Sequence, residues 1–221
     1  MAILEVIACS VADAIDAERG GAGRLEIVRA MDAGGLTPSF SLVRKIVAAV
    51  SIPVRVMLRE NAGFEAGGEA EIETLCRAAR EFAELGVDGF VLGFVRGCKL
   101  DLAPAQQILS HASGVRATFH RAFEELEDPG AAVAALKTAP PFDRVLVSPA
   151  RVHGLQQLVE SAAPELTIVA GGGVGADAIR ALLETTGIRE FHVARAARQG
   201  DDIRQPVDAR CVRKLAALVA G

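Results

Sequence analysis

The chain has no tryptophan and no tyrosine among its 221 residues, and only 4% of its residues are aromatic. Hydrophobic residues nevertheless make up 51% of the sequence. A core of that size must be built mainly from alanine, valine, leucine and isoleucine. Such aliphatic residues are typical of parallel strands that are buried on both faces. The composition therefore favours an α/β fold with a large aliphatic core.

Lysine is also scarce, because only four of the 24 basic residues are lysines. The net charge is -4 at pH 7, and the arginines are scattered along the chain. A nucleic-acid interface needs clustered basic residues, so no nucleic-acid partner is expected. None of the lysines lies at the end of an expected strand. This counts against a Schiff-base aldolase, whose chemistry needs an amine nucleophile at that place.

Cysteines are few and widely spaced, at positions 9, 76, 98 and 211, and no CxxC motif occurs. This spacing predicts neither a disulfide framework nor a structural zinc site, and reduced thiols indicate a cytosolic protein. No apolar run reaches the roughly 18 residues that a membrane span needs, so no membrane partner is expected. The chain begins with a strand-like run at residues 2–8, which argues against a signal peptide.

The sequence does contain a regular alternation of short apolar runs and amphipathic segments. The apolar runs predict strands at residues 3–7, 24–28, 52–58, 87–94, 115–120, 143–148, 166–170 and 189–193. The segments between and after them predict helices at residues 11–19, 40–49, 71–85, 102–111, 129–137, 155–161, 176–184 and 207–219. We interpret residues 98–102 as a loop.

Strict alternation of strands and helices implies right-handed crossovers and a parallel sheet. Eight such units predict a closed (β/α)8 TIM barrel that forms a single domain over residues 1–221. An open, doubly wound sheet is the alternative. A GxGxxG motif after the first strand would favour that alternative, and the sequence has none.

Polar and charged residues stand within the expected strands and at their ends. A barrel carries its functional site at the C-terminal ends of its strands. The candidate residues are Glu5, Glu26, Arg55, Arg59, His120, Arg121, Ser148 and His192. Charged side chains inside apolar strands are costly unless they are paired, so these residues form either a buried ion-pair layer or a site that converges on a ligand or metal. His120 is the leading candidate, because imidazole titrates near neutral pH and also ligates metals.

A run of three glycines follows the seventh expected strand and opens a helix, with Gly172 and Gly173 at its centre. Barrels often bind phosphate at this place, because backbone N–H groups and a helix N-terminus suit anions. A tight turn that needs positive φ angles would explain the same run. Cys9 is the only cysteine that follows the end of an expected strand closely, which makes its thiol a candidate metal ligand.

Several motifs resemble those of the copper homeostasis protein CutC family. They lie in the family's order over most of the chain: Leu-Glu-Val at 4–6, Gly-Ala-Gly-Arg-Leu-Glu at 21–26, Gly-Gly-Leu-Thr-Pro-Ser at 34–39, Thr-Phe-His-Arg-Ala-Phe at 118–123, Arg-Val-Leu-Val-Ser at 144–148, Ala-Gly-Gly-Gly-Val at 170–174 and Glu-Phe-His at 190–192. The resemblance implies a TIM barrel, a cytoplasmic location, a homodimer and a role in copper binding and copper homeostasis. It implies no organic cofactor, and Cys9 and His120 are the expected metal ligands.

The sequence departs from the family pattern where the family often carries cysteines. Ile7 and Val28 occupy those two positions. Soft thiolates are the ligands that suit Cu(I), so the chain lacks the family's natural copper ligands while it keeps the acidic, histidine and arginine residues. Three hypotheses therefore stay open for this chain: a copper-handling protein, a barrel enzyme and a non-catalytic metabolite-binding protein.

The second and third hypotheses share one ligand class, a small phosphorylated or carboxylated metabolite. In the enzyme, His120 would be the general acid or base, and Glu26 would orient it or act as a second acid or base. Arg55, Arg59 and Arg121 would hold the anion. Glu5, Ser148, Gly172, Gly173 and His192 complete the expected ligand-binding set.

Overall fold

A closed barrel of eight parallel strands forms the centre of the computed structural model, which describes residues 2–221. The barrel strands are β1 (Ile3–Ala8), β2 (Arg24–Ile27), β3 (Val54–Met57), β4 (Gly89–Leu92), β7 (Arg116–Phe119), β8 (Phe142–Val147), β9 (Thr167–Ala170) and β10 (Glu190–Val193). Neighbouring strands pair in sequence order, and β1 closes the barrel by pairing with β10. The predicted (β/α)8 barrel is thus confirmed.

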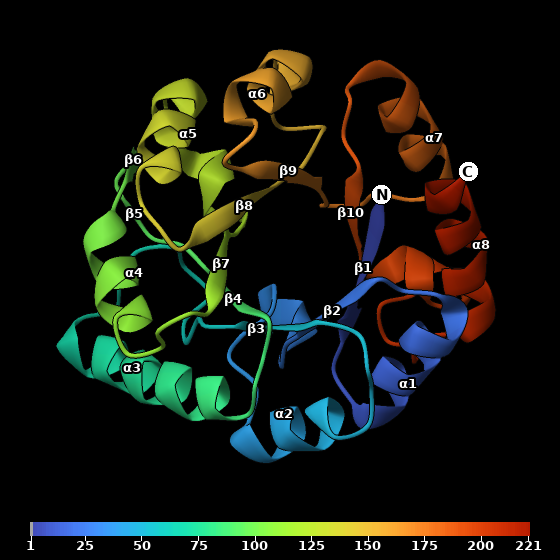
Figure 1. The fold of residues 1–221 in the computed structure, drawn as a ribbon, viewed down its shortest axis with the longest axis horizontal. Coiled ribbons are helices and arrows are strands. Elements are labelled where there is room, and N and C mark those ends of the chain that lie inside the picture. The colour runs from blue at the N-terminus through green and yellow to red at the C-terminus, as the bar shows by residue number, and fades with distance from the viewer. Residues whose placement is uncertain (1) are drawn as a thin grey trace.

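Eight α-helices lie outside the strands and surround them (Figure 1). Within residues 2–221 they are α1 (Val11–Gly20), α2 (Phe40–Val47), α3 (Glu69–Glu84), α4 (Leu102–Leu109), α5 (Pro129–Lys137), α6 (Leu155–Ala162), α7 (Ala176–Thr185) and α8 (Ala209–Ala220). The last helix packs against α1 and completes the ring. None of these helices combines the length and the apolar character that a bilayer crossing requires.

Local sequence signals explain where the helices begin and end. Ser10 caps α1 by accepting a hydrogen bond from the N–H of Asp13, and Gly21 ends this helix in the left-handed conformation. Asp128 caps α5, and Pro129 occupies its first turn, where the missing N–H costs nothing. These local signals fix the first turn of each of the two helices and the last turn of α1.

One expectation about a loop is wrong. Residues 98–102 were expected to form a loop, but Lys99–Leu100 form strand β6, which pairs with β5 (Val95–Arg96) as a small antiparallel hairpin. Gly97, with a φ angle of 59°, makes the turn between them. Two-residue strands carry too little periodicity to be recognised in a sequence. The hairpin lies outside the barrel sheet.

Alternate residues of each strand point to opposite sides, so the barrel has an outer and an inner set of side chains. In β1, Leu4, Val6 and Ala8 belong to the large aliphatic core that includes residues of the surrounding helices. Ile7 instead belongs to a separate small apolar cluster with Val28, Met57 and Val91. The barrel interior therefore contains this apolar cluster together with buried charged side chains of the strands, such as Glu5, Glu26 and Arg55.

Candidate functional site

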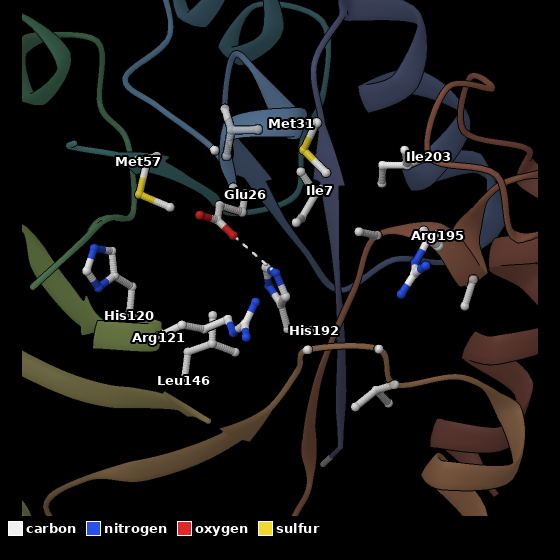
Figure 2. Close-up of a pocket in the computed structure, with 18 of the residues that line it drawn as sticks. Ile7, Glu26, Met31, Met57, His120, Arg121, Leu146, His192, Arg195 and Ile203 are labelled. Carbon is white, nitrogen blue, oxygen red and sulfur yellow. Dashed lines mark ion pairs between the residues drawn. The ribbon is translucent and has the colours of Figure 1, made fainter. Parts of the chain in front are cut away.

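A cavity of about 790 Å³ opens at the C-terminal ends of the barrel strands. The following side chains and loops line it: Ile7, Glu26, Val28, Met31, Met57, Arg59, Phe64, His120, Arg121, Leu146, His192, Arg195 and the loop at 172–175. The volume lies within the range of small-molecule sites. Figure 2 shows Glu26 and His192 near the middle of the cavity, with His120 on one flank and Arg195 on the other.

At the floor of the cavity, one imidazole lies between two carboxylates. The Nδ1 atom of His192 is 2.7 Å from Oε1 of Glu5, and its Nε2 atom is 3.4 Å from Oε2 of Glu26. All three side chains are buried. Arg24 lies below them and pairs with both Glu5 and Glu190. The strands β1, β2 and β10 are neighbours in the sheet, which explains why residues so far apart in sequence meet.

Burial and neighbouring charges shift the pKa values of Glu5, Glu26 and His192. Burial alone would raise the pKa of Glu5, but Arg24 and His192 outweigh it and hold that pKa far below its usual range. Burial raises the pKa of Glu26 to about 7, because His192 offsets the desolvation only in part and Glu5 adds repulsion. Burial disfavours the charged form of His192, yet Glu26 and Glu5 outweigh burial and raise its pKa. The neighbouring carboxylates thus favour the charged form of His192, whereas burial favours the neutral form of Glu26.

Glu26 has a further property that the other two side chains lack. Its Oε1 is the one buried side-chain nitrogen or oxygen atom within residues 2–221 that has no hydrogen-bond partner. An unpaired buried acceptor costs about 1–3 kcal/mol, so it needs a functional explanation. Glu26 lines the cavity, which means that a bound molecule could reach this side chain.

His120 stands directly after β7 and is 3% exposed. Its Nδ1 accepts a hydrogen bond of 3.2 Å from the N–H of Ala122. Burial, together with the positive charge of Arg59, lowers the pKa of His120 to about 3. Phe64 contacts the ring edge-on, with 5.2 Å between the ring centres. His120 is therefore a neutral imidazole with a fixed orientation.

Three arginines bring positive charge to the cavity wall. Arg59 is 7% exposed and donates to the backbone oxygens of five residues, at positions 33–35, 62 and 63, without any carboxylate partner within residues 2–221. Arg121 forms a two-pronged pair with Glu124. Arg195 is exposed, makes no ion pair with the described residues and projects toward the cavity in Figure 2. The sequence analysis missed Arg195, although its position just after β10 was a signal that could have found it.

The glycine loop after β9 offers free backbone donors. The N–H groups of Gly172, Gly173 and Gly175 have no hydrogen-bond acceptor within residues 2–221. Gly175 precedes α7 and cannot cap it with a side chain. Gly172 has a φ angle of 71°, and a Cβ atom there would lie 2.8 Å from Cβ of Ser148, so this position requires glycine. The tight turn is confirmed at Gly172, and the unpaired N–H groups belong to residues that line the cavity, so the anion site stays a prediction.

Arg55, Glu5 and Ser148 were expected to line the site, but they lie outside the cavity lining. Arg55 is completely buried near the start of β3, where it pairs with Asp143 and Asp88. It therefore belongs to an ion-pair layer at the N-terminal end of the barrel, and it cannot serve as an anion clamp at the opposite end. The barrel therefore holds an ion-pair layer around Arg55 and, at its opposite end, a cavity.

The expected metal ligands are only partly in place. Cys9 lies outside the cavity lining, and burial raises the pKa of its thiol to about 11, which disfavours the thiolate that binds metals. Ile7 and Val28 lie in the apolar cluster of the inner wall. The residues present therefore do not fit a thiolate site for Cu(I). Met31 and Met57, whose thioethers are soft atoms too, line the cavity.

The side chains of Glu5, Glu26 and His192 offer ligand atoms within 4.8 Å of one another. Their partners argue for an ion-pair row instead of a metal centre. Glu5 already receives a hydrogen bond from Arg24 and faces His192, so its charge is compensated. Both ring nitrogens of His192 face carboxylates, which suits a protonated imidazole and disfavours the neutral imidazole that a metal would need.

Comparison with known proteins agrees with the resemblance that the motifs indicated. The model of the CutC family matches residues 2–197. A family protein CutC of Xanthomonas axonopodis pv. citri (strain 306) is 38% identical over 198 residues, which cover 86% of this chain and 82% of that relative. A copper homeostasis protein cutC homolog of Homo sapiens is 34% identical over 197 residues, which cover 86% of this chain and 72% of that relative.

Solved structures support the same assignment at the level of the fold. A CutC structure from Streptococcus agalactiae has a TM-score of 0.79 at 24% identity and covers 87% of this chain and 98% of its own. A thiamine phosphate pyrophosphorylase from Pyrococcus furiosus shares the barrel, with a TM-score of 0.63 at 18% identity over 99% of this chain and 97% of its own. The family model and the sequence identities together establish that this chain belongs to the CutC family.

Proposed function

We propose that the protein is a barrel enzyme that binds a small organic anion in the cavity and exchanges a proton with it through Glu26. One observation carries this proposal: the unpartnered Oε1 atom of Glu26, which is buried on a side chain that lines the cavity. A carboxylate whose pKa is raised to about 7 is suited to general acid–base catalysis at neutral pH. Burial is the main cause of this raised pKa, and His192 beneath the carboxylate opposes it in part while its Nε2 atom faces Oε2.

The positive groups of the wall support an anionic ligand. Arg59 lacks a carboxylate partner within residues 2–221, and the guanidinium of Arg195 reaches toward the open cavity. The free N–H groups of Gly172 and Gly173 are donors of the kind that phosphate and carboxylate groups accept. These donors have no carboxylate partner among the described residues, so they favour a negatively charged ligand.

Calorimetric titration with 2-phosphoglycolate tests this proposal. An anion bound beside Glu26 raises the pKa of that carboxyl further, so binding between pH 7 and 8 should take up a proton from the buffer. The uptake is measured by repeating the titration in buffers of different ionisation enthalpy. We expect proton uptake in the natural protein and none in Glu26→Gln.

The variant Arg195→Met should weaken the binding at least tenfold, whereas Arg213→Met, an exposed arginine on α8, should leave it unchanged. Absence of binding, or binding without proton uptake, would contradict the proposal. Binding that both arginine variants weaken equally would do the same, because it would indicate general charge attraction instead of a site.

Copper handling is the second candidate function, and two observations favour it. Relatives carry the name of copper homeostasis proteins. Met31 and Met57 place two thioethers on the cavity wall, where Ile7 and Val28 offer no thiolate. In this candidate, copper would be a cargo held by soft thioethers and not a resident cofactor. The metal-binding role expected for Cys9 and His120 stays a prediction.

Anaerobic titration with Cu(I) against a competing chelator tests this candidate, with Zn(II) as the comparison metal. Tight binding of one Cu(I) that is lost in the double variant Met31→Leu/Met57→Leu would support it. Loss in Cys9→Ser would instead show that the thiol is the ligand. If neither change affects the binding, the cavity has no role in copper handling.

The cytoplasmic location and the homodimer implied by the family resemblance also remain part of this proposal. Light scattering of the purified chain measures its mass in solution. A mass of twice 23.1 kDa is expected for the homodimer.

A further inference from the structure

We infer that the substrate is a small anionic carbonyl compound, and that Glu26 removes a proton from the carbon beside the carbonyl while His120 donates a hydrogen bond to the carbonyl oxygen. This inference rests on the proposed function and names its substrate class. It is carried by two side chains that line one cavity and that offer unpartnered groups of opposite hydrogen-bonding character, Oε1 of Glu26 and Nε2 of His120.

The acceptor is Oε1 of Glu26, which has no partner within residues 2–221. Its carboxylate can receive a proton without breaking a hydrogen bond of this oxygen. The other oxygen, Oε2, faces the Nε2 atom of His192 at 3.4 Å, and this contact keeps the carboxylate oriented. The unpartnered oxygen is thus the one whose lone pairs are available to receive a substrate proton.

The donor is Nε2 of His120. Because Nδ1 accepts the hydrogen bond of Ala122, the proton of the neutral ring must reside on Nε2. Within residues 2–221 the side chain makes no other hydrogen bond, and it lines the cavity. Edge contacts with Phe64 and Phe119 fix the plane of the ring. His120 therefore presents one N–H group, in a set direction, to whatever occupies the cavity.

The two groups act from different walls. Glu26 comes from β2 and His120 follows β7, and these strands are three places apart around the eight-stranded barrel. Met57 and Leu146 line the cavity as well and make part of its wall apolar. A carboxylate base and a neutral imidazole donor on either side of a ligand form an arrangement that suits enolisation. The neutral imidazole stabilises the developing oxyanion without giving up its own proton.

The step balances without any further reactant. The C–H bond beside the carbonyl breaks, its proton moves to Oε1 of Glu26, and its electron pair forms the new carbon–carbon double bond. The π electrons of the carbonyl move to the oxygen, which accepts the hydrogen bond of His120. Return of the proton from Glu26 to the same carbon restores the carbonyl compound, so the reaction is a proton exchange and, at a stereogenic carbon, an epimerisation.

Exchange of substrate protons with deuterium tests the inference directly. Dihydroxyacetone phosphate and 2-oxobutyrate are incubated with the protein in D₂O, and proton NMR follows the signals of the carbons beside the carbonyl. We expect exchange above the buffer rate for at least one probe. Glu26→Gln should slow it by about 10²–10⁴-fold, because a positioned base is lost.

His120→Phe should slow the exchange by about 10²–10³-fold, as the loss of one oxyanion donor does. His120→Gln, which keeps an N–H donor, should retain more activity than His120→Phe. Glu81→Gln, an exposed position on α3, serves as the matched control for the carboxylate change. Circular dichroism confirms that each variant is folded before its rate is compared.

The nitrogen NMR spectrum of histidine-labelled protein adds a test that needs no substrate. His120 should show a neutral ring protonated on Nε2 between pH 5 and 8. A ring protonated on Nδ1, or a charged ring, overturns the inference. Absence of exchange with both probes also overturns it, and it does so separately from the proposed function if 2-phosphoglycolate still binds with proton uptake. If 2-phosphoglycolate also fails to bind, the inference and the proposed function are both refuted.

Discussion

The Nδ1 atom of His192 lies 2.7 Å from Oε1 of Glu5, and this contact fixes the ring whose other nitrogen faces Glu26. Glu5 can hold the ring because Arg24 compensates its negative charge from below. A row of contacts therefore extends from Arg24, at the N-terminal end of the barrel, through Glu5 and His192 to Glu26, which lines the cavity. The same contacts therefore affect the free energy of unfolding and the pKa of Glu26, and replacement of Arg24 should have a different effect from replacement of Glu26.

Replacement of Arg24 should be strongly destabilising. Arg24 is 2% exposed and pairs with both Glu5 and Glu190, so Arg24→Met leaves buried carboxylates with less compensation. Breaking a buried ion pair from one side costs about 3–5 kcal/mol. Chemical denaturation should show that loss in the free energy of unfolding. Arg19→Met, whose exposed arginine pairs with Asp16 at 3.8 Å, should cost less than about 1 kcal/mol. Similar effects of the two changes would mean that the barrel tolerates the unpaired carboxylates.

Glu26→Gln should stabilise the protein at alkaline pH. The pKa of Glu26 rises from 4.5 to about 7 on folding, so the stability that the protonated group gives is complete below pH 4.5 and is lost as the pH rises through 7. Neutral glutamine does not carry this cost. The gain at pH 8 should approach about 3 kcal/mol, less what His192 loses as one of its two carboxylates disappears. Thermal unfolding at pH 4.5 and pH 8 measures it.

The matched control for that prediction is Glu81→Gln, which changes an exposed carboxylate on α3. Its melting temperature should follow that of the natural protein at both pH values. If Glu26→Gln is destabilising at pH 8, then the ionised Glu26 is better compensated than its contacts indicate, and a general base with a raised pKa is excluded.

His120 should make the protein sensitive to acid. Its pKa falls from 6.5 to about 3 on folding, so the stability that its neutral form gives is complete above pH 6.5 and is lost as the pH falls toward 3. The loss amounts to roughly 1.4 kcal/mol for each pH unit below 6.5. His120→Gln should reduce the slope of unfolding free energy against pH in this range. The exposed His153→Gln is the control, and an equal slope in His120→Gln and the natural protein would refute the assignment.

Much of the fold could be predicted from the sequence because local signals coincide with the tertiary structure. The helix expected at residues 129–137 is the observed α5, since Asp128 caps it and Pro129 opens it. The strands were expected one or two residues too long at several ends, as at 52–58 against Val54–Met57. Apolar residues continue beyond the last backbone hydrogen bond that joins a strand to its neighbour. Hydrophobicity alone therefore cannot mark where a strand ends.

The height of a residue inside the barrel could not be predicted from its strand alone. Arg55 and Met57 both point inward from β3, yet Arg55 joins the ion-pair layer and Met57 lines the cavity. The two residues are only two positions apart in the sequence. A predicted strand boundary can be wrong by the same number of residues. Glu26, His120 and His192 were placed correctly in the cavity lining, because they lie close to the C-terminal ends of their strands. The stagger of strands in a barrel decides the rest, and it depends on contacts between residues that are distant in sequence.

Gly172 and Gly175 test whether the backbone conformation of the glycine loop is needed for anion binding. An added Cβ atom is crowded at Gly172 and free of contacts at Gly175. Gly172→Ala places a Cβ atom 2.8 Å from Cβ of Ser148 and forces a φ angle of 71° on alanine. We expect a loss of about 1–3 kcal/mol in the free energy of unfolding and at least a tenfold weaker affinity for 2-phosphoglycolate. Gly175→Ala has an extended backbone with a φ angle of -131° and no heavy atom within 4 Å of the added Cβ, so it should alter neither quantity. Calorimetry and chemical denaturation measure both. If Gly172→Ala lowers stability but leaves the affinity unchanged, the loop is a structural turn only, and the anion must be held by the arginines alone.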